Sequence, residues 1–144
     1  MSAGVCFKSE HGGWMQDQWS WVFSNFGITE IWERGFASTD SKIHQPTIRI
    51  DTASELPAGR PLVVLAPPDG RYIKGTESLA DFQHPENAIY LFGGSHNNVS
   101  DEDDLGGRVP AALVFIPMIE HECFGHSAAY MTLWDRYVKR GDFG

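Results

Sequence analysis

The sequence predicts an α/β domain built on a mostly parallel sheet with helices on both faces. Short apolar runs alternate with segments of helical periodicity, which is the pattern of strands separated by helices. The runs are apolar at nearly every position, as parallel strands are when both of their faces are covered. At 144 residues the chain has room for one domain, so residues 1–144 are treated as a single unit.

The first third predicts a strand, a helix and a second strand. Residues 5–7 form the first short strand, and residues 28–33 form the second. Between them, residues 14–26 predict an amphipathic helix that ends at Gly27. Its apolar side chains recur at helical spacing and are Met15, Trp19, Val22, Phe23 and Phe26. Residues 36–60 are rich in Ser, Thr, Asp and Pro and predict mostly loop, with one strand at 47–50.

The rest of the chain supplies the most apolar strands. These are residues 61–66, 88–92 and 111–116. Residues 77–82 predict a short helix that stops before His84-Pro85. The chain closes with a helix over residues 125–140, which Gly141 ends. We expect its stripe toward the protein interior to be Ser127, Tyr130, Met131, Trp134 and Val138.

Composition restricts the classes of function. The chain is 42% hydrophobic and 21% charged, the balance of a soluble globular protein. No apolar run approaches the roughly 20 residues of a membrane-spanning helix, and no basic segment with a long apolar core predicts a secretory signal. Cys6 and Cys123 follow no metal or disulfide spacing, which favours free thiols in a reducing cytoplasm. The formal charge of −8 gives no broad attraction for nucleic acid, although a local basic patch can still bind it.

Three loops are candidate ligand sites because of their position. In parallel sheets, ligands bind beyond the carboxyl ends of the strands. The loops at 66–71, 93–100 and 117–124 each follow a predicted buried strand. Gly93-Gly94 lets the main chain turn and approach a ligand closely, or it forms a plain tight turn. Backbone groups on three adjacent turns would suffice to surround an adenine.

Side chains before the last helix suggest two further hypotheses. His121 and His126 are five residues apart, which separates them by roughly 140° on a helix. A zinc site would therefore need a non-helical turn and a third ligand such as His96. Alternatively, Cys123 and His126 form a nucleophile and base, although no orienting acid is evident. The remaining alternative is that these groups line a loop or cap the helix, and we expect no metal.

An acidic run at residues 101–104 lacks the alternation and the glycine of a calcium-binding loop. We expect it to be a solvated loop. No phosphate-binding motif of the Walker type occurs.

The C-terminal half resembles the SpoU/TrmH branch of the SPOUT RNA methyltransferases. His84-Pro85-Glu86-Asn87-Ala88-Ile89-Tyr90-Leu91-Phe92-Gly93 is similar to the stretch before the second motif of that family. Residues 114–118 resemble the start of its third motif, and residues 127–136 resemble the helix that completes it. The order and spacing agree over about residues 61–140.

The resemblance implies a C-terminal trefoil knot, an exception to the usual absence of knots. It also implies a cytoplasmic homodimer that binds S-adenosylmethionine and methylates ribose 2′-hydroxyls of tRNA or rRNA. The cofactor residues would be Leu65, Ala66, Phe92, Gly93, Gly94, Ile116, Pro117, Met118 and Phe124. The first and last helices, bearing Trp19 and Trp134, would contribute to the dimer interface.

The chain departs from the family pattern at three landmarks. No Arg lies between residues 1 and 33, where the family's first helix carries one. Gly94 follows Phe-Gly in place of an acidic residue, and Glu122-Cys123-Phe124 replaces Ser-Leu-Asn. The remaining polar candidates for taking the acceptor proton are Glu10, His11, His96 and His121, unless all four cap turns.

Two other functions therefore stay open at this point. One is a dimeric, non-catalytic binding protein that uses an aromatic surface. The other is a different reaction on S-adenosylmethionine or a related nucleotide.

Overall fold

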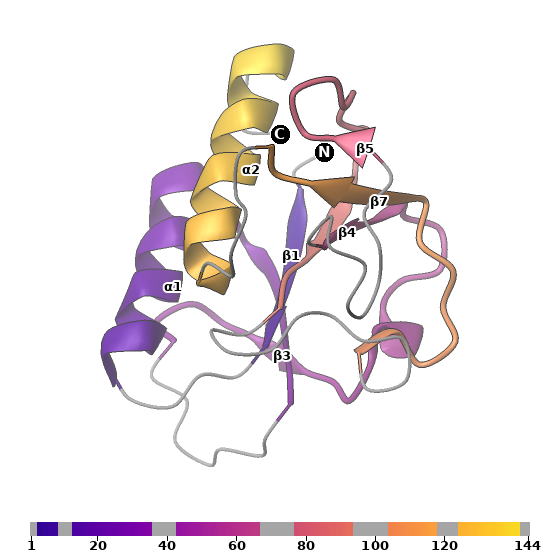
Figure 1. Cartoon of the computed structure of the whole chain (residues 1–144). Helices are drawn as coiled ribbons and strands as arrows, with labels where there is room; N and C mark the ends of the chain where they lie inside the picture. The colour runs from indigo at the N-terminus through magenta and orange to yellow at the C-terminus, as the bar shows by residue number, and fades with distance from the viewer. Residues whose placement is uncertain are drawn as a thin grey trace.

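The centre of the molecule is a seven-stranded sheet in which every neighbouring pair is parallel (Figure 1). The computed structural model describes residues 3–8, 13–35, 43–66, 77–93, 104–117 and 124–141. The strands are β1 (Gly4–Lys8), β2 (Glu30–Arg34), β3 (Ile48–Arg49), β4 (Leu62–Leu65), β5 (Glu77–Ser78), β6 (Ile89–Leu91) and β7 (Ala112–Phe115). Their order in the sheet is β3-β2-β1-β6-β4-β7-β5. The predicted α/β class with a parallel sheet is confirmed.

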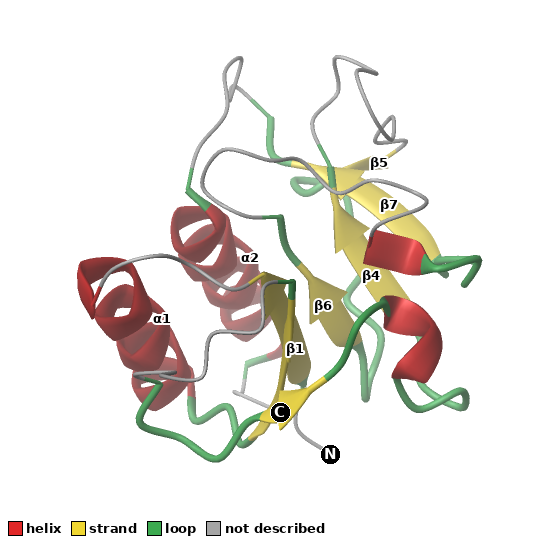
Figure 2. Ribbon diagram, turned by 90° about the horizontal axis from the view of Figure 1, so that it is seen from below, coloured by secondary structure: helices red, strands yellow, loops and turns green. Residues whose placement is uncertain are grey.

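Two α-helices, α1 (Gly13–Phe26) and α2 (Gly125–Arg140), lie side by side on one face of the sheet (Figure 2). Asn25 of α1 donates a hydrogen bond of 2.9 Å from Nδ2 to the hydroxyl of Tyr130 on α2. Both helices end where the sequence predicts. Gly27 and Gly141 follow them with φ angles of 62° and 77°, a backbone conformation that glycine adopts at little cost.

The other face of the sheet is covered without a described α-helix, which differs from the expectation of helices on both faces. It is covered by a 3₁₀ turn, η1 (Ala53–Glu55), and by the turn at residues 104–107. Thr52 caps η1, and Glu55 reaches back to the main chain of Thr52 in a capping box. The main chain leaves helical geometry at Leu56 (φ −72°, ψ 154°), directly before Pro57, so the helix stops after one turn.

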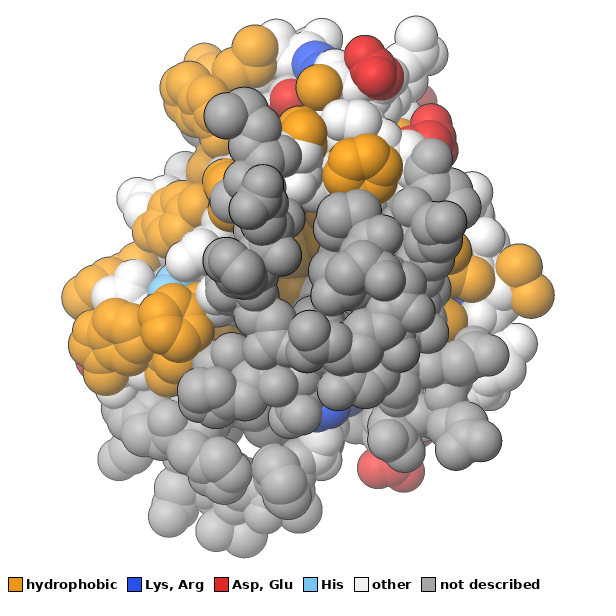
Figure 3. Space-filling view, in the orientation of Figure 1, with side chains coloured by type: hydrophobic (Ala, Val, Ile, Leu, Met, Phe, Trp, Pro, Cys, Tyr) orange, Lys and Arg blue, Asp and Glu red, His pale blue; other side chains and the backbone are white. Residues whose placement is uncertain are grey.

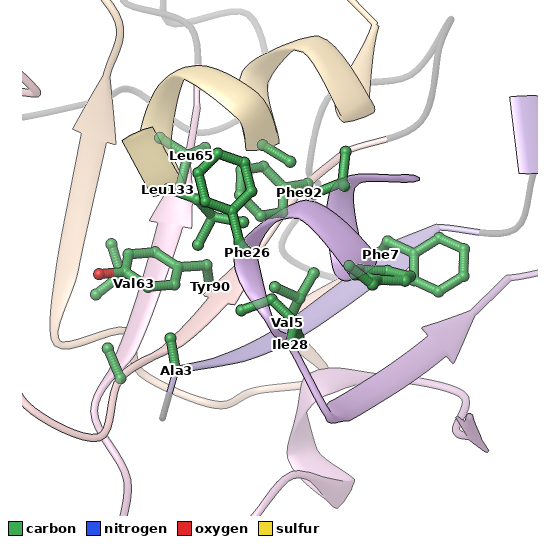
Figure 4. Packing of buried hydrophobic residues seen from close by; sticks show 14 of the residues in the cluster. Ala3, Val5, Phe7, Phe26, Ile28, Val63, Leu65, Tyr90, Phe92 and Leu133 are labelled. Atoms are coloured by element: carbon green, nitrogen blue, oxygen red, sulfur yellow. The ribbon is translucent and has the colours of Figure 1, made fainter. Parts of the chain in front are cut away.

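The main hydrophobic core lies between the two helices and the sheet (Figure 4). Trp19 is fully buried there, with its ring centroid 4.9 Å from that of Phe7 and 5.9 Å from that of Phe92. The expectation that Trp19 contributes to a dimer surface is therefore wrong. A second cluster, including Cys6, Trp32 and Leu105, fills the opposite face. Apolar packing on both faces explains why the central strands are apolar at nearly every position.

Residues 77–82 do not form the predicted helix. They begin with β5, which pairs with β7 at the edge of the sheet, and continue as a turn. The amide of Leu79 donates to the carbonyl of Phe115 at 2.8 Å, and the side chains of Leu79 and Phe82 enter the main core. Pairing with a neighbouring strand and burial of these two side chains replace the local helical preference.

The predicted inner stripe of the last helix is also partly wrong. Trp134 and Val138 are 59% and 60% exposed. The buried residues of α2 are Gly125, His126, Ala129, Thr132, Leu133 and Arg136. Polar members of this face are buried because they find partners. For example, the Thr132 hydroxyl donates to the carbonyl of Ala128 at 2.8 Å.

Neither described helix is long and apolar enough to cross a membrane.

Candidate functional site

The strand order places the ends of three apolar strands at one edge of the sheet. β4 lies between β6 and β7, with Val64 opposite Leu91 and Leu65 opposite Val114. The main chain leaves the sheet just beyond these pairs. The last hydrogen bonds run from the amide of Ala66 to Val114 at 2.9 Å and from that of Phe92 to Cys6 at 3.0 Å. The turns that follow β4, β6 and β7 therefore begin side by side.

The described residues at this edge form an apolar wall. Leu65, Ala66 and Phe92 are buried, whereas Ile116 and Pro117 are half-buried. Leu65 and Phe92 belong to the core beneath the helices, while Ala66 belongs to the opposite cluster. Gly94 and Met118, the other two residues predicted for these turns, lie outside the described residues.

The start of α2 meets the end of β6 through two glycines. A Cβ atom on Gly125 would collide with the carbonyl oxygen of Gly93 and would lie 3.0 Å from Cζ2 of Trp19. A glycine at position 125 thus allows the helix to approach the strand this closely. Phe124, the N-cap residue of α2, is brought to the same edge and is 38% exposed.

His126 lies in an aromatic cluster at this junction. Its ring stacks on Phe124 at 5.3 Å and 12°, and it meets Trp14 edge-on at 5.7 Å and 84°. Its Nδ1 atom is buried and has no hydrogen-bond partner. Burial lowers the pKa of His126 below its ordinary value, which favours the neutral ring. The ring packs as an aromatic side chain and does not cap the helix.

The zinc and nucleophile hypotheses gain no support from the described part of the chain. Within it, no group of three or more His, Cys, Asp or Glu side chains is arranged to hold a metal ion. His96, His121 and Cys123 lie outside it, as do the catalytic candidates Glu10 and His11. The spacing argument for these residues therefore stands as a sequence prediction.

A buried arginine at the same edge was missed by the sequence analysis. Arg34, the last residue of β2, is fully buried. Its Nε donates to the carboxylate of Asp104 at 2.9 Å, Nη1 donates to the carbonyl of Cys6 at 3.3 Å, and Nη2 donates to the carbonyl of Phe92 at 2.5 Å. The Lys8 ammonium, from the end of β1, lies 3.7 Å from Asp104.

Asp104 corrects the expectation of a solvated acidic loop, because it is only 1% exposed. A buried carboxylate requires a cation or several donors, and Arg34 is that cation. One sequence signal was available: Asp104 ends the acidic run and is followed directly by the apolar Leu105. Its partner, 70 residues away, has no local signal.

Cys6 is free and buried beneath this arginine, as a structural thiol would be. Its sulfur lies 3.7 Å from Nη1 of Arg34. Burial raises the pKa of the Cys6 thiol and outweighs the opposite effect of the guanidinium. The thiol therefore stays protonated and is a poor nucleophile.

The chain has the fold of the SpoU/TrmH RNA methyltransferases. No family model and no curated protein matches the sequence. The SpoU methyltransferase AviRb from Streptomyces viridochromogenes, solved with the cofactor AdoMet, matches with a TM-score of 0.70 at 18% identity, over 95% of this chain and 57% of AviRb. The A. aeolicus TrmH/SpoU tRNA modifying enzyme matches with a TM-score of 0.75 at 11% identity, over 97% of this chain and 76% of that one.

A third structure, described for the 2-OH methylation of C/U34 on tRNA, has a TM-score of 0.68 at 15% identity and covers 96% of this chain and 91% of its own. The predicted resemblance is confirmed at the level of the fold. The chain spans less than two thirds of the length of AviRb.

Proposed function

We propose that this chain is a divergent SpoU/TrmH-type enzyme that transfers a methyl group from S-adenosylmethionine to a ribose 2′-hydroxyl of tRNA or rRNA. The observation that carries the proposal is the adjacency of the ends of β6, β4 and β7, with the start of α2 packed on Gly93. AviRb, which has this fold, was solved with AdoMet, and another such protein was described for 2-OH methylation of tRNA. A trefoil knot at these turns belongs to the same proposal.

The residues at this edge suit an adenosyl group. Leu65, Ala66, Phe92 and Ile116 offer apolar surface for the faces of an adenine, and the turns beyond them offer backbone donors and acceptors for its edge. The close contact between Gly93 and Gly125 keeps side-chain bulk out of the middle of this edge. When bound, S-adenosylmethionine supplies an electrophilic methyl group on its sulfonium.

The chain itself must align the acceptor oxygen and remove its proton. We retain Glu10, His11, His96 and His121 as the candidates. Glu10 and His11 follow β1 directly, His96 follows β6, and His121 lies between β7 and α2 in the sequence. A neutral histidine is a suitable proton acceptor near pH 7.

We further propose that the protein is a homodimer that uses α1 and α2 and acts in the cytoplasm. Hydrophobic side chains gather along the surface over these two helices (Figure 3). We call this set the helix patch, and its members are Trp14, Trp21, Phe124, Trp134 and Val138, which are 38% to 60% exposed. Exposed apolar patches of this kind are typical of protein interfaces.

The helix patch also favours a second candidate function, a dimeric binding protein without catalysis. The chain carries a formal charge of −8, which opposes the approach of RNA. A reaction on S-adenosylmethionine with another acceptor is the third candidate.

Calorimetric titration with S-adenosylhomocysteine tests the cofactor site. We expect binding, and we expect Ile116→Glu to weaken it by roughly tenfold or more, because a carboxylate would replace part of the apolar wall. Val109→Glu is the matched control, since Val109 is 85% exposed and lies away from this edge of the sheet. Absence of heat at millimolar ligand, with the protein folded by circular dichroism, would overturn the proposed cofactor site.

Transfer of labelled methyl groups to bulk tRNA and rRNA then separates the candidates. Incorporation that is stable to alkali at the modified linkage supports 2′-O-methylation. Binding without transfer supports the non-catalytic protein, and transfer to another acceptor supports the third candidate.

A further inference from the structure

One guanidinium group contacts both ends of the loop that follows β6. The described chain leaves β6 through Phe92 and Gly93 and resumes at Asp104. Arg34 donates from Nη2 to the Phe92 carbonyl at 2.5 Å and from Nε to the Asp104 carboxylate at 2.9 Å. It also donates from Nη1 to the carbonyl of Cys6 at 3.3 Å, at the end of the neighbouring strand.

These contacts make Arg34 difficult to replace. Arg34 and Asp104 are 0% and 1% exposed, so each charge depends on the other. The guanidinium is a rigid planar fork whose donors point in fixed directions, and here they serve three acceptors on three segments. A lysine ammonium would keep the charge but not this geometry.

The contact with Phe92 has a direct consequence for Gly93. The carbonyl of Phe92 and the amide N–H of Gly93 belong to the same planar peptide group and point in opposite directions. Holding the carbonyl therefore fixes the direction of the Gly93 amide. Gly93 is followed by Gly94, and glycines turn easily, so the peptide would otherwise be free to rotate.

We propose that Arg34 is a positioning residue for the cofactor site: it joins the two ends of the loop after β6 and orients the Gly93 amide. This inference rests on the proposed function, because it assigns the Gly93 amide to the cofactor-binding turn. Arg34 does not touch the cofactor, and its effect is on affinity through the backbone.

A matched arginine at the opposite end of β6 serves as the control. Arg60 donates from Nε to the carbonyl of Asn87 at 3.1 Å, just before β6, and pairs with Glu30 at 2.7 Å. It is 9% exposed. Arg60→Met removes a buried cation and a backbone contact of the same kind, but far from the proposed cofactor turn.

The first measurement is the affinity for S-adenosylhomocysteine. We expect Arg34→Met to raise the Kd by roughly tenfold or more, and Arg60→Met to change it by less than about twofold, although both lower the melting temperature. Arg34→Lys should recover part of the melting temperature and little of the affinity, because charge returns without the fork geometry.

The second measurement needs no ligand. Hydrogen exchange in peptides that cover residues 92–104 should be faster by roughly tenfold in Arg34→Met and unchanged in Arg60→Met. If Arg34→Met does not fold, Asp104→Asn takes its place, since it breaks the contact at the far end of the loop. We then expect both a raised Kd and faster exchange in Asp104→Asn.

The outcomes separate this inference from the proposed function. A folded Arg34→Met, or Asp104→Asn in its place, with unchanged Kd and unchanged exchange would overturn the positioning role and leave the cofactor site standing. A wild-type protein that binds no S-adenosylhomocysteine would overturn the proposed function, and with it the role of Arg34 toward a cofactor, even if exchange at residues 92–104 depends on Arg34.

Discussion

At the scale of single residues, a buried polar cluster joins α2 to β6. His84 Nδ1 lies 2.7 Å from the hydroxyl of Tyr90, and His84 Nε2 lies 2.6 Å from the carboxylate of Asp135. Arg136 donates to the Tyr90 hydroxyl at 2.8 Å and to the carbonyl of Pro85 at 2.7 Å. Burial raises the pKa of Tyr90 to about 12, so the phenol stays protonated. This pattern assigns the Tyr90 O–H as donor to His84, and the His84 Nε2–H as donor to Asp135.

Tyr90→Phe should lower the free energy of unfolding by about 1–3 kcal/mol, because it leaves the partners of the lost hydroxyl buried and unsatisfied. Urea denaturation measures this change. Tyr130→Phe is the control, since the Tyr130 hydroxyl accepts one exposed hydrogen bond from Asn25, and we expect it to cost less than about 0.5 kcal/mol. Equal costs for the two variants would show that the cluster adds nothing beyond an ordinary hydroxyl.

His126 makes stability depend on pH. Burial lowers its pKa in the folded protein below the 6.5 of an exposed histidine. As the pH falls through 6.5, the unfolded chain therefore takes up a proton before the folded chain does. The contribution of His126 to stability is fully present above this pH and is lost as the pH falls toward its folded pKa. Burial lowers the pKa of His84 as well, in spite of Asp135, so its contribution has the same sign.

His126→Phe should remove part of this acid sensitivity. Unfolding by urea at several pH values between about 7.5 and 5 should show the variant gaining stability relative to the wild type as the pH falls, by at most about 1.4 kcal/mol per pH unit. Parallel profiles for the two proteins would contradict the assignment of a lowered pKa to His126.

At the scale of elements, the docking of α2 depends on the absence of a side chain at its first residue. Gly125 packs against the carbonyl of Gly93 and against Trp19, so the helix begins directly on the end of β6. At the other end of α2, Lys139 donates to the carbonyls of Leu79 and Phe82 at 2.6 and 2.9 Å. The helix is therefore held to the strands at both ends.

Gly125→Ala should destabilise the protein by about 1–3 kcal/mol, because a methyl group has no room at this contact. The loss outweighs the gain in helix propensity, which is about 1 kcal/mol or less at a helix end. Thermal and urea unfolding measure the change. Ser127→Ala, two residues further along and half-buried, is the control and should change stability by less than about 0.5 kcal/mol. A Gly125→Ala protein as stable as the wild type would mean that α2 does not pack on Gly93 in this way.

At the scale of the whole molecule, the helix patch determines how the protein is expected to associate. Trp21 and Trp134 are 49% and 59% exposed on adjacent helices. Covering such large aromatic side chains removes apolar surface from water, which is the main favourable contribution to association.

The double variant Trp21→Ser/Trp134→Ser should raise the dimer dissociation constant by roughly tenfold or more, with unchanged circular dichroism. Analytical ultracentrifugation measures this constant. Val109→Ser, which changes an equally accessible apolar residue away from the two helices, should leave the association unchanged. A wild-type protein that is monomeric at micromolar concentration would overturn the proposed dimer.

The elements themselves followed from local patterns. The apolar runs at 61–66, 88–92 and 111–116 contain β4, β6 and β7, and both α-helices end at the predicted glycines. Local patterns suffice here because burial on both faces, helical spacing and the backbone freedom of glycine are all properties of neighbouring residues. The predicted turns could also be placed from these strands, because all strands of a parallel sheet point the same way.

What the sequence alone determined is therefore the fold class, the helix ends and the turns that carry the candidate site. Only the tertiary structure decided which tryptophan is buried, that residues 77–82 pair as an edge strand, and that Arg34 meets Asp104. Trp19 and Trp134 both suit a helix surface or a core, and the difference lies in which neighbours each helix packs against. A pair such as Arg34 and Asp104 leaves no mark on the residues around either partner, because its energy comes from two buried charges meeting across 70 residues of chain.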